Sequence, residues 1–337
     1  MNHSSTPLQD NDPYEDLLGL WSDLEAALSV LLSGPLQISD FPGKLHQLDL
    51  WLQDLITQNS DAALYLMFQR AASSTVGYSA SHALVCASLC DVLARELRLE
   101  ETERRVLVRA ALTMNIGMNA LQDQLAEQRE PLSNHQAEAV KRHAQDSREL
   151  LQRLMIDDAL WLEVVEQHHA AKSPMPLAML SPAQRLVRIL GAVDRYAAMI
   201  SPRKTRAGRS ATESLQMLQQ NQQYADEVKA ALVRVVGLYP PGTYVQLANG
   251  EIAVVLRRGT APEQPEVASV IDQSGHSLFP PVLHQPGRSP LLVSALARSA
   301  LSLELDPRAM AQLGMHCAMH NQALYRMVQV PGTQRLA

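Results

Sequence analysis

Apolar residues recur at three- and four-residue steps along most of the chain, which is the spacing that one face of an amphipathic helix produces. Helices are predicted at about 14–32 and 42–57, from residue 61 onward, and then one after another until about residue 235. Segments that contain proline separate them. The first helix carries a stripe of large side chains, namely Leu17, Leu20, Trp21, Leu24, Leu28 and Leu31.

The pattern changes after residue 236. Three short apolar runs are typical of strands, and an Asn-Gly pair at 249–250, between the first two runs, is a strong signal for a hairpin. We therefore predict a mainly α fold, a helical bundle with a small β appendix. The three runs are 244–247, 252–256 and 266–272.

These changes in pattern divide the chain into four predicted segments. They are an N-terminal helical module (1–63), a helical domain (64–236), a β appendix (237–287) and a C-terminal helical tail (288–337). Within the C-terminal tail we expect a short helix within 290–300 and another helix at about 306–319.

The composition agrees with a helical interior. Apolar residues make up 46% of the 337 residues and aromatic residues only 4%, so the core is aliphatic. Lys and Arg number 29 against 35 Asp and Glu, and the net charge of −6 argues against DNA binding, which needs a basic face. No apolar run is long enough to span a membrane, and the polar N-terminus does not resemble a secretory signal. We expect a cytoplasmic protein with neither a DNA nor a membrane partner.

The three cysteines exclude a disulfide-rich scaffold. Cys86 and Cys90 lie four residues apart on one predicted helix, without a Cys-x-x-Cys spacing. We interpret both as free, buried thiols in a reducing compartment.

Four histidines and one aspartate occur on successive predicted helices. A single histidine on a helix is usually a core or surface residue, but an ordered series of this kind makes metal binding a hypothesis to test. The residues are His82, His143, His168, His169 and Asp194.

Six segments of the chain, most of which contain these residues, resemble the HD-GYP family when they are taken in order. The members of this family are bacterial phosphodiesterases within the HD superfamily of metal-dependent phosphohydrolases. The resemblance covers about residues 65–285 and includes the Tyr-Pro-Pro-Gly turn before the β appendix. It implies a helical HD domain, two metal ions, and cyclic di-GMP as the substrate. The matching segments are 78–82, 110–118, 138–143, 167–169, 193–196 and 202–203.

The chain departs from the family at the positions that define it. Met114 and Asn115 stand where the resemblance implies the paired His and Asp ligands, the Asp being the one that bridges two ions. A thioether is too soft a ligand for iron or manganese, and a neutral amide supplies no bridging charge. Met118 and Ala170 replace a lysine and an acid, and the Gly-Tyr-Pro loop, expected within 171–176, keeps only proline.

The remaining ligands form two incomplete groups under this resemblance. His82 and Asp194 correspond to the first metal position, whereas His143, His168 and His169 correspond to the second. We expect either no cofactor or one residual divalent metal, zinc, iron or manganese, at partial occupancy. The alternative is that these side chains are hydrogen-bonded polar groups in a cleft.

A short basic cluster follows Asp194. Arg203, Lys204 and Arg206 are candidates for binding an anion or a nucleotide, and the alternative is a solvated loop.

The first hypothesis is therefore a catalytically degenerate regulatory or interaction protein in bacterial signalling, with no catalytic residue expected. An active phosphohydrolase with an atypical site is the alternative, and a receptor that binds a cyclic dinucleotide without cleaving it is a third. We expect protein signalling partners and a homodimer formed through the N-terminal helices, because the leucine stripe at 17–31 would otherwise be exposed. The stripe could instead lie against the chain's own core.

Overall fold

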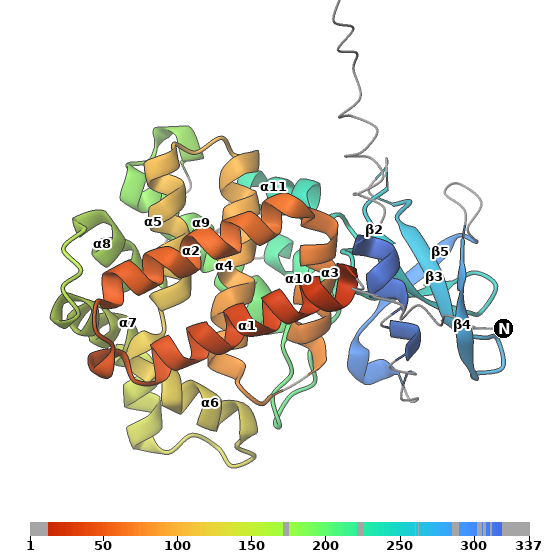
Figure 1. Cartoon of the computed structure of the whole chain (residues 1–337), viewed down its shortest axis with the longest axis horizontal. Coiled ribbons are helices and arrows are strands. Elements are labelled where there is room, and N and C mark those ends of the chain that lie inside the picture. The colour runs from red at the N-terminus through yellow and green to blue at the C-terminus, as the bar shows by residue number, and fades with distance from the viewer. Residues whose placement is uncertain are drawn as a thin grey trace, which may run out of the picture.

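The computed structural model describes residues 13–73, 75–170, 175–220, 226–259, 261, 263–284, 290–301, 305, 308–310 and 312–318. Within these ranges the fold is mainly helical, which confirms the predicted fold class, and a small sheet lies at one side of the helical body (Figure 1). Residues 1–12, which precede the first predicted helix, lie outside the described residues.

Eleven α-helices occur in the described part of the chain up to residue 236, together with three of the four short 3-10 helices. The 3-10 helices are η1 (Pro35–Gln37), η2 (Ile116–Met118), η3 (Leu177–Met179) and η4 (Arg298–Ala300). The α-helices are α1 (Pro13–Ser33), α2 (Phe41–Gln58), α3 (Ser60–Ser73), α4 (Tyr78–Glu96), α5 (Glu101–Thr113), α6 (Asn119–Glu127), α7 (Asn134–Arg153), α8 (Ala159–Gln167), α9 (Pro182–Ile200), α10 (Ala211–Gln220) and α11 (Asp226–Val236).

Local sequence fixes where the site-bearing helices begin. Ser133 and Gln136 form a capping box at the start of α7, and Ser181 and Gln184 form another at the start of α9. At the start of α8 the Asp158 side chain accepts a hydrogen bond from the backbone N–H of Trp161. Each cap satisfies backbone donors that have no partner within the helix.

Helix α4 lies at the centre of the helical body. It contacts α1, α2, α5, α6, α9 and α11, and its side chains are buried on nearly every face. Its small residues, among them Ala83, Ala87 and Ala94, allow neighbouring helices to approach closely.

The leucine stripe of α1 faces this core, so the expectation that it forms an exposed seam between two chains is wrong. Trp21, Leu24 and Leu28 are at most 1% exposed, and Leu17 and Leu31 are also buried, while Leu20 alone is open to solvent. Helix α1 contacts α2 and α4, which cover the stripe within one chain. The homodimer itself stays a prediction, now without this stripe as its interface.

The five described strands form one antiparallel sheet with the order β4-β3-β2-β1-β5. The first three confirm the predicted runs. The strands are β1 (Tyr244–Leu247), β2 (Ile252–Arg257), β3 (Glu266–Ile271), β4 (Ser277–Leu283) and β5 (Leu292–Leu296).

The short helix expected within 290–300 is wrong, because residues 292–296 of this segment form strand β5. A five-residue apolar run has too little period to separate strand from helix, and pairing with the edge of β1 decides the outcome. The sheet therefore continues beyond residue 287, and only η4 is helical in this range. Residues 308–310 and 312–318 are helical, within the longer helix predicted at 306–319.

The sheet is fixed to α3. Gly242 adopts a φ of 82°, and a Cβ atom there would lie 2.3 Å from the carbonyl oxygen of Tyr65, so only glycine fits. The Arg258 guanidinium makes an ion pair with Asp61 of α3 at 2.6 Å.

Among the described helices, none combines the length and apolar character that crossing a membrane requires.

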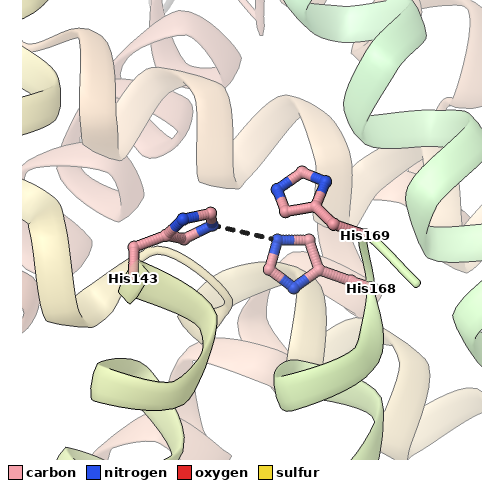
Figure 2. A group of neighbouring side chains, drawn as sticks. All are labelled: His143, His168 and His169. Atoms are coloured by element: carbon pink, nitrogen blue, oxygen red, sulfur yellow. Dashed lines mark hydrogen bonds between the residues drawn. The ribbon is translucent and has the colours of Figure 1, made fainter. Parts of the chain in front are cut away.

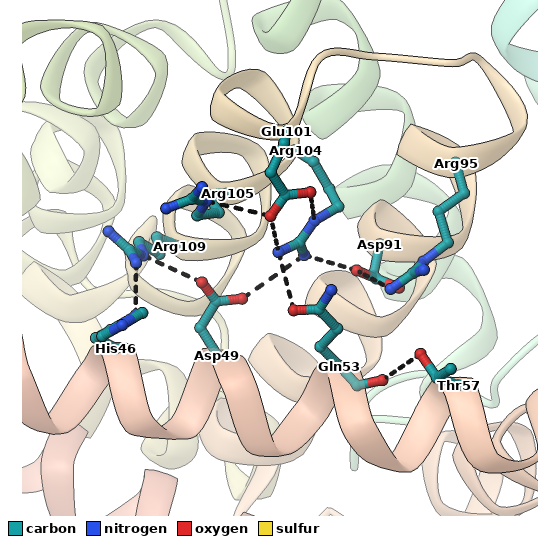
Figure 3. A network of polar contacts seen from close by, with 10 residues as sticks. All are labelled: His46, Asp49, Gln53, Thr57, Asp91, Arg95, Glu101, Arg104, Arg105 and Arg109. Atoms are coloured by element: carbon teal, nitrogen blue, oxygen red, sulfur yellow. Dashed lines mark hydrogen bonds and ion pairs between the residues drawn. The ribbon is translucent and has the colours of Figure 1, made fainter.

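A buried network of charges joins the N-terminal helices to the core (Figure 3). The Arg104 guanidinium on α5 lies 2.7 Å from Asp91 on α4 and 3.8 Å from Asp49 on α2, and all three side chains are almost fully buried. Burial raises the pKa of Asp49, and the charges of Arg104 and Arg109 oppose that shift. These contacts connect α2, α4 and α5 across the predicted boundary at residue 63.

We expect Arg104→Leu to lower the free energy of unfolding by about 3 kcal/mol, because it leaves two buried carboxylates short of a counter-charge. The matched control is Arg105→Leu on the same helix. Arg105 is exposed and pairs with the exposed Glu101, so its loss should cost less than about 1 kcal/mol. Urea unfolding followed by circular dichroism measures both, and equal losses would contradict the assigned role of Arg104.

Candidate metal centre

Helices α4 and α9 bring the first pair of predicted ligands together. His82 lies in the first turns of α4 and Asp194 lies in the second half of α9. The His82 Nε2 atom is 3.0 Å from an Asp194 carboxylate oxygen, and both side chains are buried. The structure thus brings these two side chains together, and metal binding by them stays a prediction.

A third donor atom, which the sequence interpretation assigned only to packing, lies beside this pair. The Cys86 Sγ atom is 3.6 Å from His82 Nε2, one helical turn further along α4, and Cys86 is fully buried. The only sequence signal for it is the four-residue spacing between His82 and Cys86, which places both on one face of a helix.

An aromatic and a cationic side chain cover the His82 side of the site. The Tyr78 ring is stacked on the His82 ring with centroids 5.6 Å apart and an interplanar angle of 9°. The Arg203 guanidinium lies over the Tyr78 ring, 5.4 Å from its centroid. Burial raises the pKa of the Tyr78 hydroxyl, so this residue is a neutral wall of the site.

The second group of predicted ligands also converges. Figure 2 shows the rings of His143, from α7, and of His168 and His169, just after α8, facing one another. The centroid of the His143 ring lies 5.2 Å from the centroid of the His168 ring and 5.0 Å from that of the His169 ring. His143 and His168 are buried, whereas His169 is exposed.

Backbone hydrogen bonds fix how two of these rings are protonated. The Nδ1–H of His143 donates to the Val140 carbonyl and that of His168 to the Val165 carbonyl, both at 2.6 Å. In the neutral rings both Nε2 atoms then carry lone pairs, and these atoms lie only 3.3 Å apart. The contact is stabilised only by an additional proton or by a cation between the rings.

Burial and neighbouring side chains shift the pKa of one residue in each of the two groups, His168 and Asp194. Burial, together with the charge of the adjacent His169, lowers the pKa of His168 to about 3, so His168 is neutral near pH 7. Burial alone would raise the pKa of Asp194, but the hydrogen bond to His82 and the imidazoles around it hold that pKa well below its usual range.

The three-histidine group fits a metal ion. Two nitrogen ligands at the usual distance from a tetrahedral zinc are roughly 3.3–3.4 Å apart, close to the observed separation of His143 and His168. Bonds from the far ring nitrogen to backbone carbonyls are also the arrangement that orients histidine ligands. His143, His168 and His169 would hold the ion and leave one position open.

The departures at the family signature lie just after the last residue of α5. Met114 is 1% exposed and belongs to the hydrophobic core, while Asn115 is half-buried. Gly117 keeps a structural role, because a Cβ atom there would lie 2.6 Å from the backbone nitrogen of Ser147 on α7. Of the expected Gly-Tyr-Pro loop, residues 171–174 lie outside the described residues.

The three cations of the basic cluster have separate partners. Lys204 makes an ion pair with Glu127 at 3.2 Å, and the Arg206 guanidinium donates to backbone carbonyls at the end of α9, among them that of Ala198. Arg203 alone lies against the His82 side of the site. Anion binding by this cluster stays a prediction.

Comparison with known families decides what this helical body is. Residues 62–228 match the HD domain. This segment of the chain is therefore similar to an HD domain. A stretch of 185 residues is 30% identical to the cyclic di-GMP phosphodiesterase PA4108 of Pseudomonas aeruginosa, and it covers 54% of this chain and 45% of that protein. The chain thus matches less than half the length of this curated relative.

The fold of this HD domain is also that of a known structure. Bd1817, a HDG"Y"P protein from Bdellovibrio bacteriovorus, superimposes with a TM-score of 0.50 and 12% identity over 68% of this chain and 74% of that one. At this identity the likeness shows the fold alone. The match to the HD domain and the likeness to the cyclic di-GMP phosphodiesterase PA4108 agree with the resemblance to the HD-GYP family.

The buried neutral His168 predicts how stability depends on pH in the metal-free protein. Its pKa of about 3 lies below the usual value near 6.5, so between these values the unfolded chain binds more protons than the folded one. The free energy of unfolding should therefore fall on acidification from pH 7 to 5, by up to about 1.4 kcal/mol per pH unit from this group.

Urea unfolding at several pH values, with chelator present, measures this slope. His168→Gln should make it shallower because the variant has no proton to gain at this position. His135→Gln is the matched control, since His135 is exposed, and it should keep the wild-type slope. Equal slopes in all three proteins would contradict the assignment.

Proposed function

We propose that this chain is a non-hydrolytic, regulatory HD-GYP-type protein of cyclic di-GMP signalling that works in the bacterial cytoplasm. The observation that carries the proposal is the replacement of the paired signature ligands by Met114 and Asn115. Without the bridging carboxylate, His82 and Asp194 on one side and the three histidines on the other have no shared anion between them.

The lost charge matters because two-metal hydrolysis needs both ions at once. One ion generates hydroxide, and both hold the attacking and leaving oxygens of the phosphate, at a separation of about 3.5–4 Å. A neutral amide at position 115 cannot offset the repulsion between two divalent ions at that distance. The chain would then keep the fold and a binding site but not the reaction.

A metal held by His143, His168 and His169 would supply positive charge and one open coordination position for an anionic ligand. Arg203, stacked over Tyr78, adds a second cation on the other side of the site. A cyclic dinucleotide has two phosphates, which could each contact one of these two positive charges. A protein signalling partner would then bind the chain differently in its ligand-bound and ligand-free states.

An active phosphohydrolase is the second candidate. The three imidazoles with one open position are also the ligand set of some mononuclear catalytic zinc sites, and this arrangement favours it. Turnover separates the two candidates, because both are compatible with one metal ion at the three histidines.

The purified chain should not convert cyclic di-GMP when iron, manganese or zinc is supplied under anaerobic conditions. The reason is the missing pair of ligands at positions 114 and 115. Product formation is measured by chromatography, with the Pseudomonas aeruginosa phosphodiesterase as the positive control. Turnover above that of a variant with both His168→Ala and His169→Ala would overturn the non-hydrolytic proposal.

The double change Met114→His and Asn115→Asp should raise the manganese or iron bound per chain without restoring full activity. It rebuilds the charged ligand pair, while the segment 171–176 still lacks the Gly-Tyr-Pro residues, and a misplaced substrate costs orders of magnitude in rate. Elemental analysis and turnover are measured on the same preparation. Met118→Lys alone is the control and should change neither.

A further inference from the structure

Three different donor atoms converge between α4 and α9, outside the three-histidine group. His82 offers an imidazole nitrogen, Cys86 a thiol and Asp194 a carboxylate oxygen, and one ligand atom from each lies within 4.8 Å of the other two. All three residues are buried. The cysteine distinguishes this group from a set of ligands made only of nitrogen and oxygen.

We propose that His82, Cys86 and Asp194 form a site for a soft divalent cation, zinc, in which the Cys86 thiolate is a metal ligand. Cys86 would supply the negative charge that the signature position at Asn115 does not. This inference is independent of the proposed regulatory function, because it concerns a different group of ligands and holds for an enzyme or a receptor alike.

The distances fit a zinc ion. Sulfur and nitrogen ligands at about 2.3 and 2.0–2.1 Å from a tetrahedral zinc are roughly 3.6 Å apart, and the Cys86 Sγ to His82 Nε2 distance is 3.6 Å. The carboxylate of Asp194 lies 3.0 Å from the same Nε2 atom. A small rotation of this carboxylate would replace the hydrogen bond by two bonds to the metal.

The charges of the ligands also balance. One thiolate, one carboxylate and a neutral imidazole carry two negative charges, which neutralise a divalent cation in a buried site. Burial disfavours the free thiolate, so Cys86 carries its proton before the metal arrives. Binding then forms the zinc–sulfur bond, breaks the S–H bond and releases one proton to solvent.

The sulfur ligand also sets the preference for the metal. Thiolates favour zinc and other soft ions, whereas magnesium and manganese prefer oxygen ligands. A site made of one sulfur, one nitrogen and one oxygen should therefore select zinc over manganese, which is the reverse of what a carboxylate-rich pair would do.

Cobalt reports the sulfur ligand directly, because a thiolate bound to Co²⁺ gives a charge-transfer absorption band in the near ultraviolet. The full-length chain, stripped of metal by chelation, is titrated with Co²⁺ and then with Zn²⁺. We expect the band to appear with cobalt and to disappear when zinc displaces it. The variant with both His168→Ala and His169→Ala should keep the band, since those residues belong to the other group.

Cys86→Ser should abolish the band and weaken zinc binding at this site by about 100-fold or more, given that loss of an outer partner alone costs 10–100-fold. Cys90→Ser is the matched control, since Cys90 is equally buried one turn further along α4 and should keep the band. Circular dichroism confirms that each variant is folded.

X-ray absorption of the zinc-loaded Cys90→Ser chain provides a test that does not depend on changing Cys86. We expect a sulfur neighbour at about 2.3 Å from zinc. Absence of this neighbour, or a cobalt band that survives Cys86→Ser, would overturn the proposed ligation. Zinc bound through nitrogen and oxygen alone would leave the three-histidine site intact and refute only this inference.

Discussion

The burial of helix α4 is the constraint on which the rest of the body depends. A helix covered on nearly every face must provide a partner for each polar side chain that it carries, because an unpaired polar group in the interior costs several kcal/mol. His82 meets Asp194 on α9, and Asp91 meets Arg104 on α5. The candidate site and the ion-pair network thus both supply partners for buried polar side chains of α4.

In the segment after α5, the residues that the fold needs differ from the residues that would bind metal. Gly117 is needed for the close approach of η2 to α7, and this chain keeps it while the two residues that would bind metal have changed. Met114 fills the core at 1% exposure, where a flexible thioether packs well. The loss of a ligand at this position therefore has no evident cost in packing.

The helical fold, the first three strands and the two groups of ligands could be predicted, because periodicity fixes helices and the resemblance fixes which histidines converge. Strand β5 could not, since a short apolar run takes its form from the edge of β1 that it pairs with. The contact of Arg104 with Asp49 also left no pattern, because charges far apart in sequence have no period. Cys86 has the spacing of a ligand and of a core residue alike, and only its distance to His82 separates the two.

Electrostatics sets what the two groups of ligands can do together. Two divalent ions 4 Å apart repel by about 17 kcal/mol even at an effective dielectric constant of 20, so a pair of metals needs negative charge close by, either between the ions or among the ligands of one of them. Asn115 does not provide this charge. A thiolate at Cys86 together with Asp194 would neutralise one ion within its own group, and a second ion at the three histidines would then face no net charge. Local neutralisation would thus allow both groups to be filled without the bridge, but it would leave no shared ligand to align two ions on one phosphate.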